Sequence, residues 1–319
     1  MAATSIHDHY TTHEGSLSLP DGHGLYTKSW LPTQPAKARL VFVHGFSDHC
    51  NFYGVLFPEL AKHAIATYSF DQRGWGRSVH SPSQKGLTGS TQVVMDDITH
   101  FIKSLPKEDG EETPLFLMGH SMGGGQVLYY AAKGDAEVKK TIRGYLGEAP
   151  SIALREKPNI VVSTLGRLAG KVLPHRQMLQ KLDATKICRD PDVCKEWDAD
   201  ALCHDTGTLE GLAGMLDRAA ELEEGKARID ESCGEGGKTR LWIGFGTGDH
   251  ILSEPVCRKW FEGLKVEDKE YKVYEGWYHK LHAEPGDDKF TFANDVARWI
   301  VDRSGAVDAL GGVVGKPKL

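Results

Sequence analysis

The serine in the segment Gly119-His120-Ser121-Met122-Gly123 has the surroundings of a catalytic nucleophile. A short apolar run, residues 115–118, leads directly into Gly119, and a glycine-rich segment that can begin a helix follows Ser121. A strand, a sharp turn and a helix in this order hold a serine on a strained backbone and expose its hydroxyl above a sheet. Gly119 and Gly123 suit such a turn, because side chains there would collide with neighbouring backbone. The segment therefore predicts nucleophilic catalysis by Ser121.

A serine nucleophile needs a general base, and the base needs an acid that orients it. For a nucleophile on this kind of turn the chain order is serine, acid, histidine. His279 follows a predicted strand, residues 271–274, at a glycine-containing loop where a base above the sheet must lie, and His282 is its nearest competitor. Asp249 ends the preceding predicted strand, 30 residues before His279. Ser121, Asp249 and His279 are therefore the predicted triad.

Acyl transfer through a serine also needs two backbone N–H donors where negative charge develops on the carbonyl oxygen. Met122, the residue after the nucleophile, is predicted to supply one of them. Phe46 is predicted to supply the other, because it lies in the loop after the first central strand and Gly45 permits a tight bend there.

The elements that must position these residues alternate between short apolar runs and amphipathic helical stretches, which predicts an α/β fold with a mostly parallel central sheet flanked by helices. Predicted strands cover residues 39–43, 65–70, 115–118, 143–146, 241–245 and 270–274. Predicted helices cover residues 52–63, a stretch from a Ser90 cap to about Leu105, residues 123–130 and residues 290–301.

Between residues 150 and 229 this alternation stops, and the pattern becomes helical and irregular. We interpret this stretch as an all-helical cap inserted into an α/β core that comprises residues 1–149 and 230–305, with a flexible tail at 306–319. Most of the cap's apolar residues are expected to attach it to the core. They are Leu165, Leu168, Val172, Leu173, Leu209, Leu212, Met215, Leu216 and Leu222.

Composition excludes several classes of protein. The chain has 319 residues and a formal net charge of −6, which argues against nucleic acid as a partner. No apolar run approaches the length of a membrane-spanning helix, and the polar N-terminus does not resemble a secretory signal. The six scattered cysteines are therefore expected to be reduced thiols in a cytoplasmic protein. Cys188 and Cys194 lack a histidine pair at zinc-finger spacing, so no metal site is predicted.

Five blocks together resemble the monoacylglycerol lipase branch of the serine hydrolases, within the hydrolase-4 or serine-aminopeptidase-like group. They are HGFSDHCNFY (44–53), FDQRGWGRS (70–78), GHSMGGG (119–125), GTGDHI (246–251) and YEGWYHKLH (274–282). The resemblance extends over about residues 15 to 303. It implies an α/β-hydrolase fold and hydrolysis of monoacylglycerols through an acyl-enzyme, with no metal or organic cofactor. It also assigns the triad and the oxyanion amides to the residues named above.

The resemblance further implies which residues hold the glycerol head group. Asp48 and His282 occupy two of the family's three positions, and Phe52 occupies the third, where animal members carry arginine. An apolar ring cannot donate a hydrogen bond to a hydroxyl, so Asn51 is the candidate substitute. The family's cap covers an acyl tunnel and touches membranes or lipid droplets, which implies a peripheral location here. Leu165, Leu168, Leu173 and residues 209–216 are the candidates for these contacts.

Other functions on the same scaffold stay open at this point. They are a carboxylesterase, a lysophospholipase, a serine aminopeptidase and a non-catalytic receptor with the hydrolase fold. An aminopeptidase needs acidic side chains around the α-ammonium of its substrate, and the candidates are Glu148, Glu210, Asp217 and Glu221. Epoxide hydrolases and dehalogenases place aspartate on the turn, so Ser121 argues against them.

Overall fold

The computed structural model describes residues 4–106, 113–156 and 160–306, and the side chains of residues 160–165 lie outside that description. The predicted flexible tail falls almost entirely outside the described residues.

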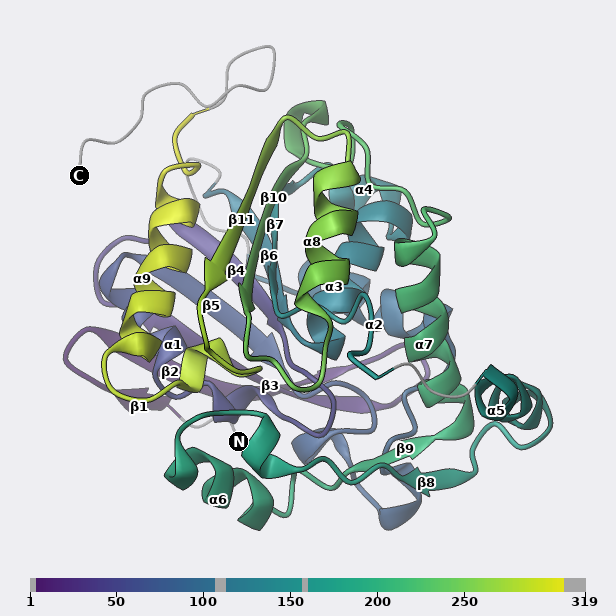
Figure 1. Cartoon of the computed structure of the whole chain (residues 1–319). Coiled ribbons are helices and arrows are strands. Elements are labelled where there is room, and N and C mark those ends of the chain that lie inside the picture. The colour runs from purple at the N-terminus through teal and green to yellow at the C-terminus, as the bar shows by residue number, and fades with distance from the viewer. Residues whose placement is uncertain (1–3, 107–112, 157–159, 307–319) are drawn as a thin grey trace.

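A nine-stranded sheet forms the centre of the molecule, with the strand order β1-β2-β3-β5-β4-β6-β7-β10-β11 (Figure 1). The strands are β1 (Thr4–Ile6), β2 (Tyr10–Ser18), β3 (Gly24–Pro32), β4 (Ala38–Val43), β5 (Ile65–Phe70), β6 (Leu115–His120), β7 (Ile142–Glu148), β10 (Arg240–Gly246) and β11 (Asp268–Tyr274).

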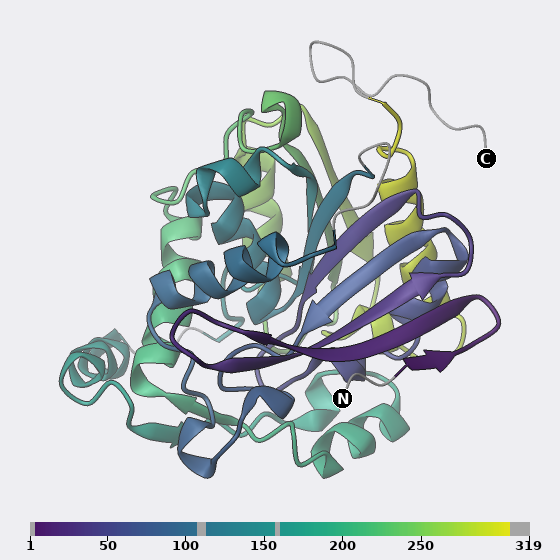
Figure 2. The ribbon, with the colours of Figure 1, turned by 180° about the vertical axis from the view of Figure 1, so that it is seen from behind.

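The six strands from β5 to β11 in this order pair in parallel, and β1, β2 and β3 pair antiparallel at one edge (Figure 2). The predicted strands all belong to the parallel part. Every residue of β5, β6, β7 and β10 is buried, which is why each reads as a short apolar run in the sequence. The antiparallel strands β1–β3 were not predicted, because their faces are partly exposed and their sequences are mixed.

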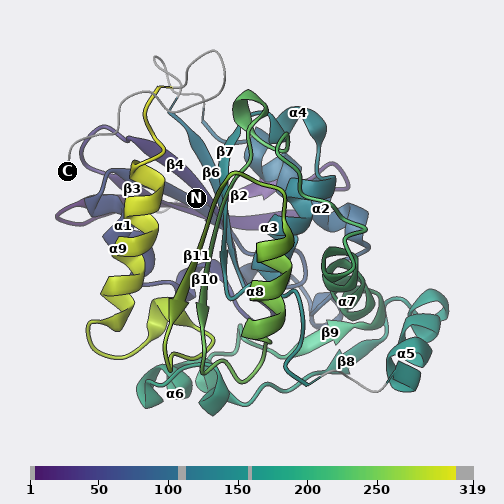
Figure 3. The same cartoon turned by 45° about the horizontal axis from the view of Figure 1, so that its top comes forward.

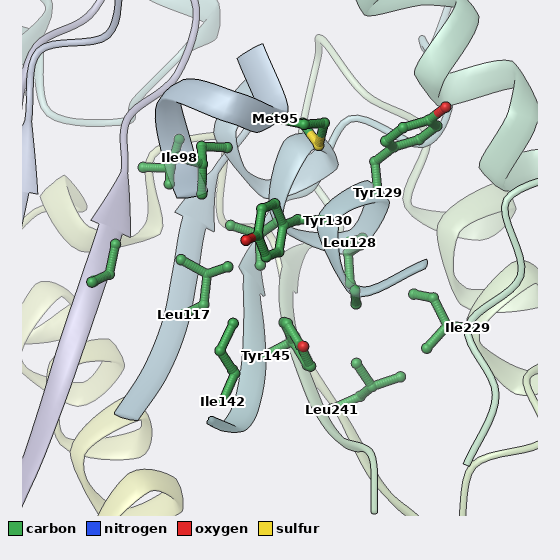
Figure 4. Packing of buried hydrophobic residues seen from close by; sticks show 14 of the residues in the cluster. Met95, Ile98, Leu117, Leu128, Tyr129, Tyr130, Ile142, Tyr145, Ile229 and Leu241 are labelled. Carbon is green, nitrogen blue, oxygen red and sulfur yellow. The ribbon is translucent and has the colours of Figure 1, made fainter. Parts of the chain in front are cut away.

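Helices cover both faces of the sheet. They are α1 (Leu56–Lys62), α2 (Thr91–Lys103), α3 (Met122–Lys133), α4 (Ala136–Lys139), α8 (Glu254–Gly263) and α9 (Asp288–Val301). Helices α1 and α9 pack in one hydrophobic cluster, and α2, α3 and α8 pack in the other. Strand β6 contributes side chains to both clusters. Leu117 packs in the cluster of α2, α3 and α8, and its neighbours Phe116 and Met118 pack in the cluster of α1 and α9. Figure 4 shows Leu117 near Tyr130 of α3, in the same cluster as Met95 and Ile98 of α2.

The local signals that predicted these helices are visible in the structure. Ser90 caps α2, with its hydroxyl oxygen accepting from the Val93 N–H at 3.4 Å. Helix α1 begins at Leu56, later than predicted, because a short 3₁₀ turn at Cys50–Phe52 precedes it. The six cysteines are free and buried. Among the residues that the structure describes, no helix is both long and apolar enough to cross a membrane.

The segment between β7 and β10 contains α5 (Ile160–Val172), β8 (Gln177–Leu179), α6 (Pro191–Ala199), β9 (Thr206–Thr208) and α7 (Leu209–Glu223). The prediction of an all-helical insertion was wrong in one respect, because β8 and β9 pair as a small antiparallel sheet. Strands of three residues are too short to show an alternating pattern. Figures 1 and 3 show α5, α6, β8 and β9 gathered at one end of the large sheet. We refer to this segment as the cap.

Candidate active site

Ser121 lies between β6 and α3 with φ 54° and ψ −118°, a conformation that residues with a side chain rarely adopt. Three backbone hydrogen bonds hold it there. Its N–H donates to the Glu148 carbonyl oxygen at 2.9 Å, and its own carbonyl oxygen accepts from Ser151 at 2.9 Å and Gly125 at 3.0 Å. Strained backbone of this kind persists only where the surroundings fix it, and it is concentrated at functional sites.

The glycines on either side of Ser121 are required for close packing, as predicted. A Cβ atom on Gly119 would lie 2.3 Å from the Gly123 carbonyl oxygen. A Cβ atom on Gly123 would lie 2.1 Å from the Val43 carbonyl oxygen at the end of β4. Both separations are far below van der Waals contact, so the turn can approach β4 only because neither residue has a side chain.

Asp249 and His279 form a buried pair. The Nδ1 atom of His279 lies 2.7 Å from Oδ2 of Asp249, and the two residues are 4% and 1% exposed. Oδ1 of Asp249 accepts the backbone N–H groups of Ile251 at 2.7 Å and Leu252 at 2.9 Å. With both carboxylate oxygens fixed, His279 is oriented through Nδ1, and Nε2 is left as the nitrogen that can act on a substrate.

Ser121 and His279 line the same cavity, which has a volume of about 370 Å³. Most of its wall is apolar and comes from the cap. Four cap residues line it that the resemblance had named as candidates for acyl or lipid contacts: Leu209, Leu212, Met215 and Leu216. Leu222, which was expected to attach the cap to the core, is buried in the core. The side chain of Leu165 lies outside the described residues.

Phe46 and Met122, the predicted oxyanion residues, both line this cavity beside Ser121. Gly45 allows the Phe46 loop to approach, because a Cβ atom there would lie 3.3 Å from the Cβ atom of Ser121. The loop is also held by the cap, since the hydroxyl oxygen of Ser47 accepts from the Asp205 N–H at 2.8 Å. The structure therefore brings Ser121, His279 and both residues with candidate oxyanion amides to one cavity, and the predicted acid Asp249 contacts His279.

Comparisons with known proteins identify the family and the fold. Residues 34–286 match the family Hydrolase_4, described as serine aminopeptidase S33. The chain belongs to this family. A Schizosaccharomyces pombe protein named "Putative monoglyceride lipase" is 32% identical over 88% of this chain and 72% of its own length. The Saccharomyces cerevisiae protein named "Monoglyceride lipase" is 29% identical over 84% of this chain and 86% of its own. The crystal structure of Paleococcus ferrophilus monoacylglycerol lipase has a TM-score of 0.74 at 27% identity, covering 88% of this chain and 99% of its own. The fold is therefore the α/β-hydrolase fold.

In this Hydrolase_4 member, Asp48 and Lys280 form a buried ion pair in the cavity wall, which also includes the polar side chains of Ser151, Arg167 and Gln180. The Nζ atom of Lys280 lies 2.7 Å from Oδ2 of Asp48, and the residues are 3% and 1% exposed. Burial by itself would raise the pKa of Asp48, but the charge of Lys280, with smaller contributions from His44 and His49, holds this pKa below its ordinary value. Asp48 is therefore an ionised carboxylate in a buried ion pair.

The other predicted head-group residues, Asn51 and His282, are not among the residues that line the cavity. The side-chain amide of Asn51 donates to the Tyr26 hydroxyl at 3.3 Å and accepts from Lys28 Nζ at 2.9 Å. His282 is 2% exposed, and its Nδ1 lies 2.7 Å from Oε1 of Glu148. The arrangement does not bring either side chain to a substrate in the cavity. Lys280, which the sequence reasoning passed over, lines the cavity.

Glu148, His282 and His120 form a second buried cluster beside the triad. The His120 ring centroid lies 4.8 Å from that of His279 and 5.2 Å from that of His282. Burial lowers the pKa of His120 well below its ordinary value, and the neighbouring imidazoles and Lys280 lower it further. His120 is therefore neutral at neutral pH.

Two groups of side chains have donor atoms within 4.8 Å of one another, close enough to hold a metal ion. They are His120, Glu148 and His282, and separately His49, Asp200 and Cys203. Each contains an imidazole and a carboxylate in direct contact, at 2.7 Å for His282 and Glu148 and 2.9 Å for His49 and Asp200. Hydrogen bonding accounts for both contacts, and His49–Asp200 also connects the Asp48 loop to the cap.

Proposed function

We propose that this protein is a serine hydrolase that cleaves the ester bond of monoacylglycerols and releases a free fatty acid and glycerol. The observation that carries the proposal is one cavity with a mostly apolar wall that is lined by Ser121, by His279, which is bonded to Asp249, and by the Asp48–Lys280 ion pair. Such a cavity matches a molecule with a reactive ester between an acyl chain and a polar head. The relatives named monoglyceride lipases support the same substrate class.

The proposed reaction proceeds through an acyl-enzyme. Nε2 of His279 takes the proton of the Ser121 hydroxyl, and the serine oxygen attacks the ester carbonyl. The backbone N–H groups of Phe46 and Met122 stabilise the oxyanion, and the N-terminus of α3 adds a partial positive charge. His279 then gives its proton to the departing glycerol oxygen. Water, activated by the same histidine, hydrolyses the acyl-enzyme, and the free acid leaves.

The structure argues against the aminopeptidase alternative for this cavity. None of Glu148, Glu210, Asp217 and Glu221 lines it. Asp217 pairs with Arg167, and Glu221 accepts from the Tyr129 hydroxyl. Asp48 does line the cavity, but Lys280 already neutralises it. A substrate's α-ammonium would thus meet no uncompensated carboxylate among the described residues that line the cavity.

We further propose that the outer surface of the cap contacts lipid. Helix α5 and strand β8 expose large apolar side chains: Leu168 (54%), Val172 (78%), Leu173 (57%) and Leu179 (68%). Contiguous exposed apolar residues mark surfaces that bind proteins or membranes. Co-sedimentation with phosphatidylcholine vesicles should fall in the variant Leu168→Ser/Leu173→Ser, and unchanged binding would contradict this proposal. A cytoplasmic location remains a prediction.

A substrate panel with one acyl chain tests the proposed function. The wild-type protein should hydrolyse monoacylglycerols with higher kcat/KM than diacylglycerols, lysophospholipids or aminoacyl amides. Ser121→Ala should abolish ester turnover, and a fluorophosphonate should label the wild-type protein but not this variant. Preference for aminoacyl amides would refute the lipase proposal, and absence of labelling in the wild-type protein would favour a non-catalytic receptor.

A further inference from the structure

Lys280 is placed to contact the head group of a substrate. It follows His279 directly in the chain, lines the cavity, and is buried except for this surface. Its Nζ atom lies 2.7 Å from Oδ2 of Asp48 and 4.3 Å from the centroid of the Phe52 ring. An ammonium group has three N–H donors. Asp48 uses one, and the face of Phe52 attracts the charge without accepting a conventional hydrogen bond. Lys280 therefore retains donor capacity for a ligand.

Asp48 has acceptor capacity left as well. Its Oδ2 accepts from Lys280 and, at 3.0 Å, from the Tyr53 hydroxyl. Its Oδ1 accepts only the His49 backbone N–H, at 2.8 Å. A carboxylate oxygen has about two acceptor sites, so Oδ1 can accept one more donor. The ion pair can thus offer one donor and one acceptor to the same ligand, which is what two neighbouring hydroxyl groups require.

The charges of the pair restrict the ligand further. Asp48 and Lys280 neutralise each other, and both are withdrawn from water, so an additional charge near either one is not screened. A phosphate group would meet the Asp48 carboxylate, and a quaternary ammonium would meet the Lys280 cation. A neutral diol is repelled by neither the Asp48 carboxylate nor the Lys280 cation. Repulsion of wrong substrates contributes to specificity as much as attraction of the right one.

We propose that Lys280, together with Asp48, is a specificity-determining residue that selects neutral glycerol esters over lysophospholipids that carry charged head groups. The inference rests on the proposed function, because it assumes that the ester in the cavity carries a glycerol head. The backbone N–H of Lys280 also donates to the Ile187 carbonyl oxygen of the cap at 2.7 Å. That bond fixes the position of Lys280 relative to the base, His279, so the head group and the ester carbonyl are held in one geometry.

The test compares two esters with the same acyl chain, 1-decanoylglycerol and ethyl decanoate. The quantity measured is the ratio of their kcat/KM values, which cancels effects on acyl binding and on the chemical step. In Lys280→Met the ratio should fall about tenfold or more, the usual effect of losing a hydrogen bond to a charged group. Lys140→Met is the matched control, since Lys140 is an exposed lysine paired with Glu137. It should keep the wild-type ratio.

The double variant Asp48→Asn/Lys280→Met guards against misfolding, because it leaves no buried charge without a partner. Its ratio should also fall about tenfold or more. A wild-type ratio in the folded double variant, or in folded Lys280→Met, would overturn the proposal. If the wild-type protein itself shows no preference for 1-decanoylglycerol over ethyl decanoate, the proposed function fails instead.

The single variant Asp48→Asn tests the role of charge. It leaves the Lys280 cation without a counter-charge, so kcat/KM for decanoyl-lysophosphatidic acid should rise relative to 1-decanoylglycerol. The same comparison with decanoyl-lysophosphatidylcholine should show no such rise, because that head group also carries a cation. Equal changes for the two lysophospholipids would contradict selection by charge.

Discussion

The substitution Gly123→Ala tests whether close packing of the turn against β4 sets the geometry of the active site. The added methyl group would lie 2.1 Å from the Val43 carbonyl oxygen and 2.4 Å from that of His44, whereas ordinary contact begins at 3.4 Å. The backbone of α3 and the end of β4 must therefore separate by about 1.3 Å. Ser121 and Met122 belong to one side of this gap and Phe46 to the other, so the serine and one oxyanion amide move away from the second amide.

The expected loss in kcat/KM is about 10²-fold, the usual result of a misplacement of about 1 Å in a catalytic geometry. The free energy of unfolding should fall by about 1–3 kcal/mol, as for other overpacked sites. Steady-state kinetics on protein titrated with a fluorophosphonate, and urea unfolding, measure the two effects separately. Gly263→Ala is the matched control, because a Cβ atom there has no heavy atom within 4 Å. Gly123→Ala with wild-type kcat/KM would refute the reasoning.

Three further predictions concern buried and partly buried polar groups. Asp249→Asn should lower kcat by about 10⁴-fold without unfolding the protein, because an amide favours the wrong tautomer of His279, and a loss below tenfold would contradict the triad. Glu148→Leu should lower the free energy of unfolding by about 2–6 kcal/mol in urea, because it leaves the backbone N–H and Nδ1 of His282 without their shared acceptor. Burial lowers the pKa of His204 to about 4. Between about pH 6.5 and pH 4 the unfolded chain therefore binds a proton at this residue that the native state does not. The free energy of unfolding should decrease as the pH is lowered from about 6.5 to 4. His204→Phe should flatten this fall in the urea midpoint between pH 8 and pH 5, and an unaltered slope would contradict the assignment.

The parallel part of the fold was predictable because its signals are local. Strands buried on both faces give continuous apolar runs, and β5 was predicted with its observed bounds. The turn at Ser121 also follows from neighbouring residues alone, since glycines are needed at fixed offsets around it. Asp249 and His279 could be placed because the carboxyl ends of parallel strands meet at one edge of the sheet, and each follows such an end.

The cap was predictable only in outline. Its location follows from the point where the α/β alternation stops, but the direction in which its apolar side chains face depends on contacts across the chain. Leu212 and Leu222 have the same chemistry and lie on one helix, yet Leu212 lines the cavity and Leu222 is buried in the core. Helical spacing alone does not distinguish these two surroundings, since both remove the side chain from water.

The head-group residues show why a position read alone can mislead. Phe52, in place of an arginine, suggested that the site had lost a hydrogen-bond donor, and Asn51 was the nearest polar substitute in sequence. The physical requirement is a positive charge beside the buried Asp48, because a buried carboxylate without a counter-charge is costly. That charge can come from either of two loops that meet above the sheet, and here it comes from Lys280, 232 residues along the chain from Asp48. The Lys280 Nζ atom lies over the ring of Phe52, in a cation–π contact. The residue that completes the ion pair with Asp48 can therefore be recognised only once the two loops are placed together.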